Sequence, residues 1–194
     1  MPITTIKTAT GDSRLTDAAI IAASRRDPTR FAEIFDRHWP RIHRYCVSRA
    51  GVAGEDVAAE TFRVALDSLR RFDRTREDAR PWLYGIATNL LRRNLRSESR
   101  RTRALLRLHR GEEADLADGV LNRVEAEALG PEVAAALGRL PAAQREALLL
   151  SAWGELTYEQ VAEATGVPVA TVRSRMHRAR ASIRRALQHE EALR

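Results

Sequence analysis

Five polar side chains near the C-terminus fall on one face of a predicted helix: Thr171, Ser174, His177 and Arg178, with Arg173 at the margin. No acidic residue interrupts this face. Guanidinium groups pair with phosphates and with guanine edges, whereas threonine, serine and histidine make smaller contacts with bases. The pattern therefore predicts a recognition helix that enters the major groove of DNA.

The residues before this helix predict the rest of a helix-turn-helix. Thr157 can cap a first helix, with Gln160 as its capping-box partner. Gly166 supplies the turn, and Pro168 is tolerated only near the start of the next helix. An amphipathic surface helix with solvated arginines is the alternative interpretation. The capping box, the turn and an apolar stripe at helical spacing favour the helix-turn-helix; the stripe comprises Val169, Val172, Met176, Ala179, Ile183 and Leu187.

A second basic stretch lies in the middle of the chain. Pro81 begins a predicted helix whose far end carries Arg92, Arg93, Arg96, Arg100, Arg101, Arg103, Arg107 and Arg110, offset only by Glu98. Taken alone, this run is equally consistent with a solvated helix end. Together, the two basic sites suggest that the protein touches nucleic acid at two tethered points, because tethering raises the effective concentration of a weak second site.

Composition agrees with a nucleic-acid partner. The 194-residue chain carries a net charge of +7 and has a pI of about 10.7, which favours a polyanion. Cys46 is the only cysteine, so an intrachain disulfide and a cysteine-cluster zinc site are excluded, and a reducing compartment fits. The chain shows no signal-peptide core and no apolar run long enough to span a bilayer. We expect a cytoplasmic protein without membrane insertion, metal or cofactor.

The apolar spacing predicts an all-α fold of two small helical domains joined by a flexible linker. We expect a disordered tail over 1–13, a first block over 14–101, a linker over 102–130 and a second block over 131–194. Pro40 falls inside one predicted helix, where it could kink or reset it. The linker assignment rests on a reversal of charge, because the acidic residues Glu112, Glu113, Asp115, Asp118, Glu125 and Glu127 follow the arginine run.

Motifs in both blocks resemble those of the extracytoplasmic function sigma factors of bacterial RNA polymerase, which consist of sigma domain 2 and sigma domain 4. In the second block, residues 140–150 resemble the LP-x-x-x-R-E opening of domain 4, and 166–180 resemble its G-V-P-x-x-T-V-R-S-R-x-x-R-A-R signature. In the first block, 30–35 resemble the start of domain 2, 55–62 its polymerase-binding helix, and 81–90 its promoter-melting segment.

The resemblance implies a transcription initiation factor that is a monomer when free. It would bind core RNA polymerase at the β′ clamp helices and the β flap, recognise the minus 35 and minus 10 elements of promoter DNA, and assist melting. An anti-sigma factor is a further candidate partner. The implied polymerase contacts are Asp56, Glu60 and Thr61, and the implied minus 35 contacts are Thr171, Arg173, Ser174, His177 and Arg178. The implied minus 10 contacts are Arg74, Arg76, Arg80, Trp82, Asn89, Arg92, Arg93 and Arg96.

Two positions depart from the family pattern. Ala59 stands where the polymerase-binding helix often has glutamine, which weakens the expectation for that contact. Arg93 stands where the melting helix often has aspartate, which makes the DNA-facing end more basic.

Two other classes of protein are alternatives to a sigma factor. A helix-turn-helix transcriptional regulator that is not a polymerase subunit would need a dimerisation surface, or a ligand or receiver domain, and the first block shows neither a receiver pattern nor a metal cluster. A recombinase-type enzyme would need an α/β catalytic domain with a nucleophile. Neither that alternation nor a phosphate-loop, Gly-x-Gly-x-x-Gly or His-Glu-x-x-His motif occurs in the chain, so we expect no enzymatic activity.

Overall fold

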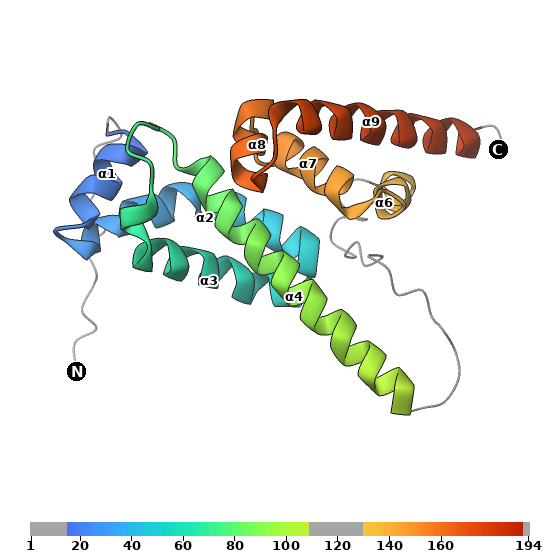
Figure 1. The fold of residues 1–194 in the computed structure, drawn as a ribbon, viewed down its shortest axis with the longest axis horizontal. Helices are drawn as coiled ribbons and strands as arrows, with labels where there is room; N and C mark the ends of the chain where they lie inside the picture. Colours follow the sequence, from blue (N-terminus) through green and yellow to red (C-terminus); the bar gives the residue numbers. More distant parts are fainter. Residues whose placement is uncertain (1–14, 109–129, 192–194) are drawn as a thin grey trace.

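Residues 15–108 and 130–191 are described by a computed structural model of the protein (Figure 1). Within these ranges the chain forms α-helices and two short 3-10 helices and no strand, so the predicted all-α class is confirmed. The predicted tail over 1–13 and linker residues 109–129, with their acidic side chains and Arg110, lie outside the described residues.

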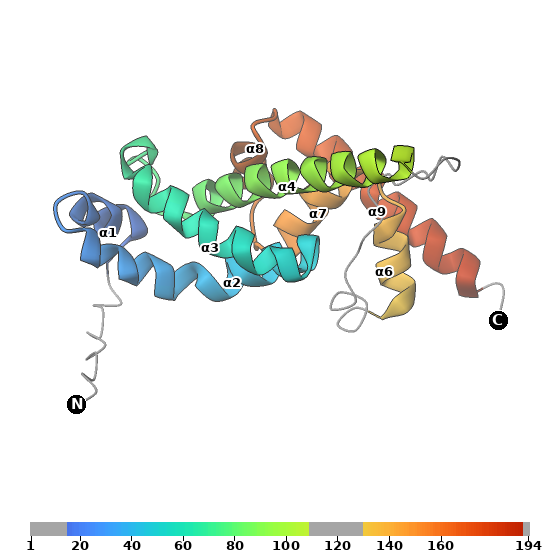
Figure 2. The same cartoon turned by 90° about the horizontal axis from the view of Figure 1, so that it is seen from below.

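The elements of the first block form a helical bundle. They are α1 (Asp17–Ser24), η1 (Pro28–Phe31), α2 (Ala32–Ala50), α3 (Val52–Asp67), η2 (Leu69–Arg71) and α4 (Arg80–Leu108). The helices α2 and α3 run side by side along α4 (Figure 2). Gly54 lets them approach closely, because a Cβ there would lie 2.3 Å from the carbonyl oxygen of Cys46. Pro40 lies inside α2 without ending it.

Helix α4 is longer than the sequence predicted. It continues to Leu108, past the predicted end of the first block at residue 101. Its final residues include several arginines, leucines and an alanine, which are strong helix formers and therefore extend the helix. Part of the predicted linker is thus helical.

The second block contains the predicted helix-turn-helix. Its elements are α6 (Pro131–Gly138), α7 (Ala142–Ala152), α8 (Tyr158–Thr165) and α9 (Val169–Glu191). Thr157 and Gln160 form both bonds of the capping box. Gly166 ends α8 in the left-handed region with φ of 69°, which glycine adopts without the Cβ penalty. Arg145 is buried and donates to the carbonyls of Leu137, Gly138 and Leu140, so it closes the end of α6.

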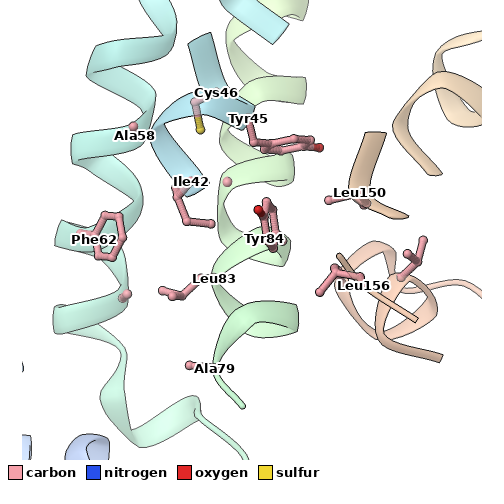
Figure 3. Close-up of a cluster of buried hydrophobic side chains, with 14 of the residues drawn as sticks. Ile42, Tyr45, Cys46, Ala58, Phe62, Ala79, Leu83, Tyr84, Leu150 and Leu156 are labelled. Carbon is pink, nitrogen blue, oxygen red and sulfur yellow. The ribbon is translucent and has the colours of Figure 1, made fainter. Parts of the chain in front are cut away.

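One continuous hydrophobic core joins the two blocks. Helix α4 lies between the α2–α3 pair and the helices α7 and α8 (Figure 1). Leu83 points from α4 toward α3, whereas Tyr84 faces Leu150 and Leu156 of the second block (Figure 3). Both α4 side chains are fully buried. The sequence predicted two separate blocks and did not predict this contact between them.

Candidate nucleic-acid interface

The outer face of α9 carries all five residues predicted to contact the minus 35 element. Its inner face is fixed by Val172, Met176 and Ala179, which are buried. On the outer side, Arg173, His177 and Arg178 are exposed, whereas Thr171 and Ser174 are half-buried. Arg178 donates a hydrogen bond of 2.5 Å to Oγ of Ser174, one helical turn earlier. The five residues therefore lie on one surface that is open to a large ligand.

A neighbouring stripe on α9 extends this surface. Arg173, His177, Arg180 and Arg184 line a shallow pocket of about 350 Å³, and Tyr158 from the start of α8 lines the same pocket. Tyr158 and Arg180 were not among the residues predicted from the sequence. Arg180 could have been found, because it follows Arg173 by seven residues and so falls on the same side of the helix.

The loop before α4 and the first residue of that helix hold three of the arginines predicted to bind the minus 10 element. Arg74 and Arg76 are exposed. Arg80 forms a salt bridge of 2.8 Å with Asp78. The loop begins with a tight turn in which Asp73 accepts hydrogen bonds from the N–H and the hydroxyl of Thr75. These bonds favour the carboxylate and lower the pKa of Asp73.

The first turns of α4 place Trp82 and Asn89 in a second pocket. The pocket has a volume of about 450 Å³ and is lined by Phe72, Trp82 and Asn89 on one side and by residues 163–166 on the other. Trp82 packs edge-on against Phe72, with 5.2 Å between ring centroids. It is only partly buried and packs against the core. Helix α8 thus forms one wall of the pocket that holds the predicted melting residues.

Close packing holds this wall in place. A Cβ at Gly85 would lie 3.2 Å from the carbonyl oxygen of Ala164, so the glycine lets α8 approach α4. Polar contacts surround the packed surfaces. Gln160 donates to Asp78 at 2.9 Å, and Arg76 lies 3.5 Å from Glu163.

Another residue predicted to contact DNA pairs across the boundary between α4 and the second block. Arg92 donates to Glu146 of α7 at 2.5 and 3.1 Å. Arg76, Arg80 and Arg92, which the resemblance places on DNA, are therefore all paired with carboxylates of their own chain.

The predicted polymerase residues lie beside a wide groove between α3, α4 and α7. The groove has a volume of about 1290 Å³ and is lined by Asp56 and Glu60 together with Arg93 and Arg96. Glu60 accepts two hydrogen bonds from Arg63, which lower the pKa of its carboxyl group. Asp56 is exposed and lies one turn before Glu60, so the two carboxylates share one side of α3.

Thr61 requires a correction. Its side chain is 0 % exposed, and its hydroxyl donates to the carbonyl of Val57 at 2.7 Å. It directly follows Glu60 in a helix, so it points about 100° away from that carboxylate and into the core. Thr61 is not available to a partner in this structure, and we omit it from the polymerase surface.

Both blocks match known protein families. Residues 34–101 match Sigma-70 region 2, and residues 131–183 match Sigma-70, region 4. The ECF RNA polymerase sigma factor RpoE of Cereibacter sphaeroides is 30% identical over 166 residues, which cover 84% of this chain and 88% of the relative. SigW of Bacillus subtilis is 30% identical over 175 residues, with 84% and 91% covered. The chain belongs to the ECF RNA polymerase sigma factors.

Two solved structures share the fold. CnrH, in complex with the cytosolic domain of CnrY, aligns with a TM-score of 0.67 at 24% identity, covering 89% of this chain and 97% of that one. RpoE of Bartonella quintana, in complex with the anti-sigma factor NepR, aligns with a TM-score of 0.64 at 22% identity, covering 81% and 96%.

Family membership fixes the general activity of this sigma factor. It is a promoter-specific transcription initiation factor that binds core RNA polymerase and promoter DNA. Sigma factors are not enzymes. Within the described residues, no cluster of three or more metal-ligating side chains occurs. In those same ranges, no helix combines the length and the apolar character that a bilayer crossing requires.

Proposed function

We propose that the protein reads a promoter with two separate faces. The outer face of α9 enters the major groove of the minus 35 element, and the loop 73–79 with the first turns of α4 receives the minus 10 element. The observation that carries the proposal is the acid-free outer face of α9, which belongs to a helix-turn-helix inside the sequence that matches region 4. We assign residues 14–101 and 131–194 to the two DNA-binding units and 102–130 to their linker.

The minus 35 face has two kinds of side chain with different tasks. Ser174, His177 and Arg178 occupy the middle of the outer face, where base edges are within reach of a helix in the major groove. Arg184 and Arg185 are exposed and lie two turns farther along. At that distance the helix leaves the groove, so these arginines contact phosphates. Sequence preference therefore comes from the first group, and general affinity comes from the second.

The minus 10 face requires a rearrangement. A base that leaves the duplex needs an aromatic surface and polar partners, because unstacking costs a few kcal/mol. Trp82 and Asn89 supply these groups, but α8 forms the opposite wall of their pocket. A DNA strand must reach the pocket from outside. We therefore expect α8 to move away from α4 when the promoter is engaged, which also releases Arg76 from Glu163 and Arg92 from Glu146.

Polymerase binding is assigned to the exposed side of α3. Asp56 and Glu60 present two carboxylates there, which suits the basic clamp helices of the β′ subunit. The second unit then contacts the β flap. An anti-sigma factor is proposed as a regulator, because RpoE of Bartonella quintana shares this fold and was solved in complex with the anti-sigma factor NepR.

Reconstitution with purified core polymerase tests the proposal. The protein should bind core polymerase one to one, and run-off transcription on a randomised promoter library should return a minus 10 and a minus 35 sequence. A helix-turn-helix regulator outside the polymerase would bind DNA alone and would not form a stoichiometric complex with core polymerase. Absence of that complex would contradict the proposed function.

A further inference from the structure

Asp17 in α1 is a buried carboxylate that the DNA and polymerase surfaces leave without a role. It is 5 % exposed. Its Oδ2 accepts a hydrogen bond of 2.9 Å from the backbone N–H of Ala79 and lies 2.7 Å from Nε2 of His38. Its Oδ1 accepts a bond of 2.6 Å from Nη1 of Arg37. One side chain thus ties α1 and α2 to a residue that lies 62 positions later in the chain.

The contact with Ala79 falls at the start of the promoter-melting helix. Ala79 directly precedes α4, and its carbonyl accepts the N–H of Leu83 at 2.9 Å, so the first turn of the helix begins from this residue. The first N–H groups of a helix have no partner within the helix and need an outside acceptor. Asp17 is that acceptor, and its negative charge is favourable at the positive end of the helix dipole.

The electrostatics of the contact keep Asp17 ionised. Burial by itself raises the pKa of Asp17, but the hydrogen bond and charge interaction with His38 lower it, and the N–H of Ala79 and Arg37 add to this effect. The resulting pKa is about 2. The carboxylate therefore accepts bonds from all three partners throughout the range in which the protein works.

Other contacts of the loop 73–79 do not duplicate this one. The Asp73 turn bonds only to Thr75 and Arg76, within the loop itself. Asp78 bonds to the neighbouring Arg80 and to Gln160 of the second unit. The bond to Gln160 would be lost when α8 moves away. The bond from Ala79 to Asp17 does not involve α8. Among the hydrogen bonds described, it therefore holds the end of the loop to the first block both when α8 packs on α4 and when α8 has moved away.

We propose that Asp17 is a positioning residue for minus 10 recognition, which anchors the start of α4 so that Trp82 and the loop arginines meet the promoter in a fixed geometry. The inference rests on the proposed function of the loop. Trp82 lies three residues after Ala79, so a shift at the anchor moves the ring directly. Recognition of a flipped base is sensitive to such shifts, because misplacement by about 1 Å can lower a rate by about 100-fold.

The test replaces Asp17 with a residue of the same size. In wild type, the three donors bond to the two carboxylate oxygens of Asp17. In Asp17→Asn only one oxygen remains to accept them, and the new N–H₂ group faces a donor, either the guanidinium of Arg37 or the imidazole of His38. With reconstituted holoenzyme and a promoter that carries 2-aminopurine in the minus 10 element, we expect the rate of opening to fall about tenfold or more. Affinities for core polymerase and for duplex minus 35 DNA should stay within about twofold of wild type, since both surfaces lie elsewhere.

The matched control is Asp27→Asn. Asp27 is an exposed aspartate whose side chain accepts hydrogen bonds from the N–H and the hydroxyl of Thr29 in η1. Opening by this variant should equal that of wild type. If Asp17→Asn does not fold, Arg37→Gln takes its place: it removes one donor to Asp17 from a partly exposed position and should cause a smaller loss of the same kind.

The outcomes separate the two proposals. Normal opening by folded Asp17→Asn, or by Arg37→Gln if the first variant does not fold, would overturn the positioning role. A parallel loss of core binding, minus 35 binding and opening would also overturn it, because a residue with a general structural role would affect all three. If wild-type protein itself does not bind core polymerase or open promoters, the proposed function fails instead.

Discussion

Arg92 of α4 donates two hydrogen bonds to the carboxylate of Glu146 in α7, at 2.5 and 3.1 Å. The Glu146 side chain is 5 % exposed, whereas that of Arg92 is 38 % exposed. The pair joins the two helical blocks across their boundary. Family resemblance predicts that Arg92 contacts the DNA backbone. Because its guanidinium is bonded to Glu146, this sigma factor must break that bond before Arg92 can bind a phosphate.

Removing the arginine should therefore destabilise the protein. In Arg92→Ala, Glu146 stays buried without the guanidinium, and we expect the free energy of unfolding to fall by about 1–2 kcal/mol. Urea unfolding at neutral pH measures the change. Arg93→Ala is the control, because Arg93 is exposed and belongs to the same helix. Equal stability of the two variants would show that the pair does not hold the units together.

The packing of α8 on α4 should depend on the absence of a side chain at Gly85. In Gly85→Val, the added atoms would press on the backbone of Ala164, where a Cβ alone would lie 3.2 Å away. We expect the two units to separate in the free protein. Distances between spin labels on the exposed parts of α3 and α9 would lengthen and spread. Arg93→Val introduces the same side chain at an exposed position of α4 and should leave the distances unchanged.

Substitutions in α9 should separate contacts with bases, which set sequence preference, from contacts with phosphates, which set general affinity. Arg178→Ala should weaken binding to the preferred minus 35 sequence by about 1–3 kcal/mol and relax the preference at one base position. Arg184→Ala should weaken binding to all sequences about equally and lower the salt slope by about one phosphate. Salt titrations on a set of single-base variants measure both effects. A uniform loss with Arg178→Ala would contradict the proposed docking of the helix.

Charge reversal on α3 tests the polymerase surface. The double variant Asp56→Arg, Glu60→Arg should weaken binding to core polymerase while the circular dichroism spectrum stays helical, because Asp56 is exposed and Glu60 is only half-buried. Glu55→Arg is the control, since this exposed residue lies on a different side of the helix. Thr61→Val should lower stability rather than affinity, because the hydroxyl is buried. Unchanged affinity of the double variant would remove α3 from the docking surface.

The pH dependence of stability should reflect Asp17. Its pKa is about 2 in the folded protein, against 3.8 for the ordinary group. The folded state therefore binds the proton more weakly than the unfolded chain, and the ionised carboxylate stabilises the protein fully above pH 3.8. As pH falls from 3.8 through 2, a contribution of about 2 kcal/mol should be lost. Urea unfolding across this range should show a weaker pH dependence for Asp17→Asn than for wild type.

The helix-turn-helix is the part of the fold that the sequence by itself determined. Thr157 and Gln160 are three residues apart, and the bonds between them depend on little beyond that spacing. Gly166 adopts a backbone conformation that few other residues tolerate. The burial of Val172 and Met176 follows from helical periodicity. Each of these features is set by neighbours within one turn, so pattern and chemistry were enough to predict them.

Thr61 marks the limit of transferring a site by resemblance. The family motif places it beside Glu60 along the chain, but a helix turns the two side chains in different directions. Thr61 lies four residues after the apolar Val57, which is buried, and residues at this spacing share one side of a helix. This spacing could have predicted that Thr61 faces inward. The outward direction of Asp56 could be predicted from the same periodicity.

Only the tertiary structure decided which charges meet across the boundary. Arg92 and Glu146 are 54 residues apart, and Asp78 and Gln160 are 82 apart. No local pattern links such pairs, because their distance depends on how α4 packs against the second unit. That packing arises from many weak apolar contacts, among them Tyr84 between the units, and their sum is fixed only when the whole chain has folded.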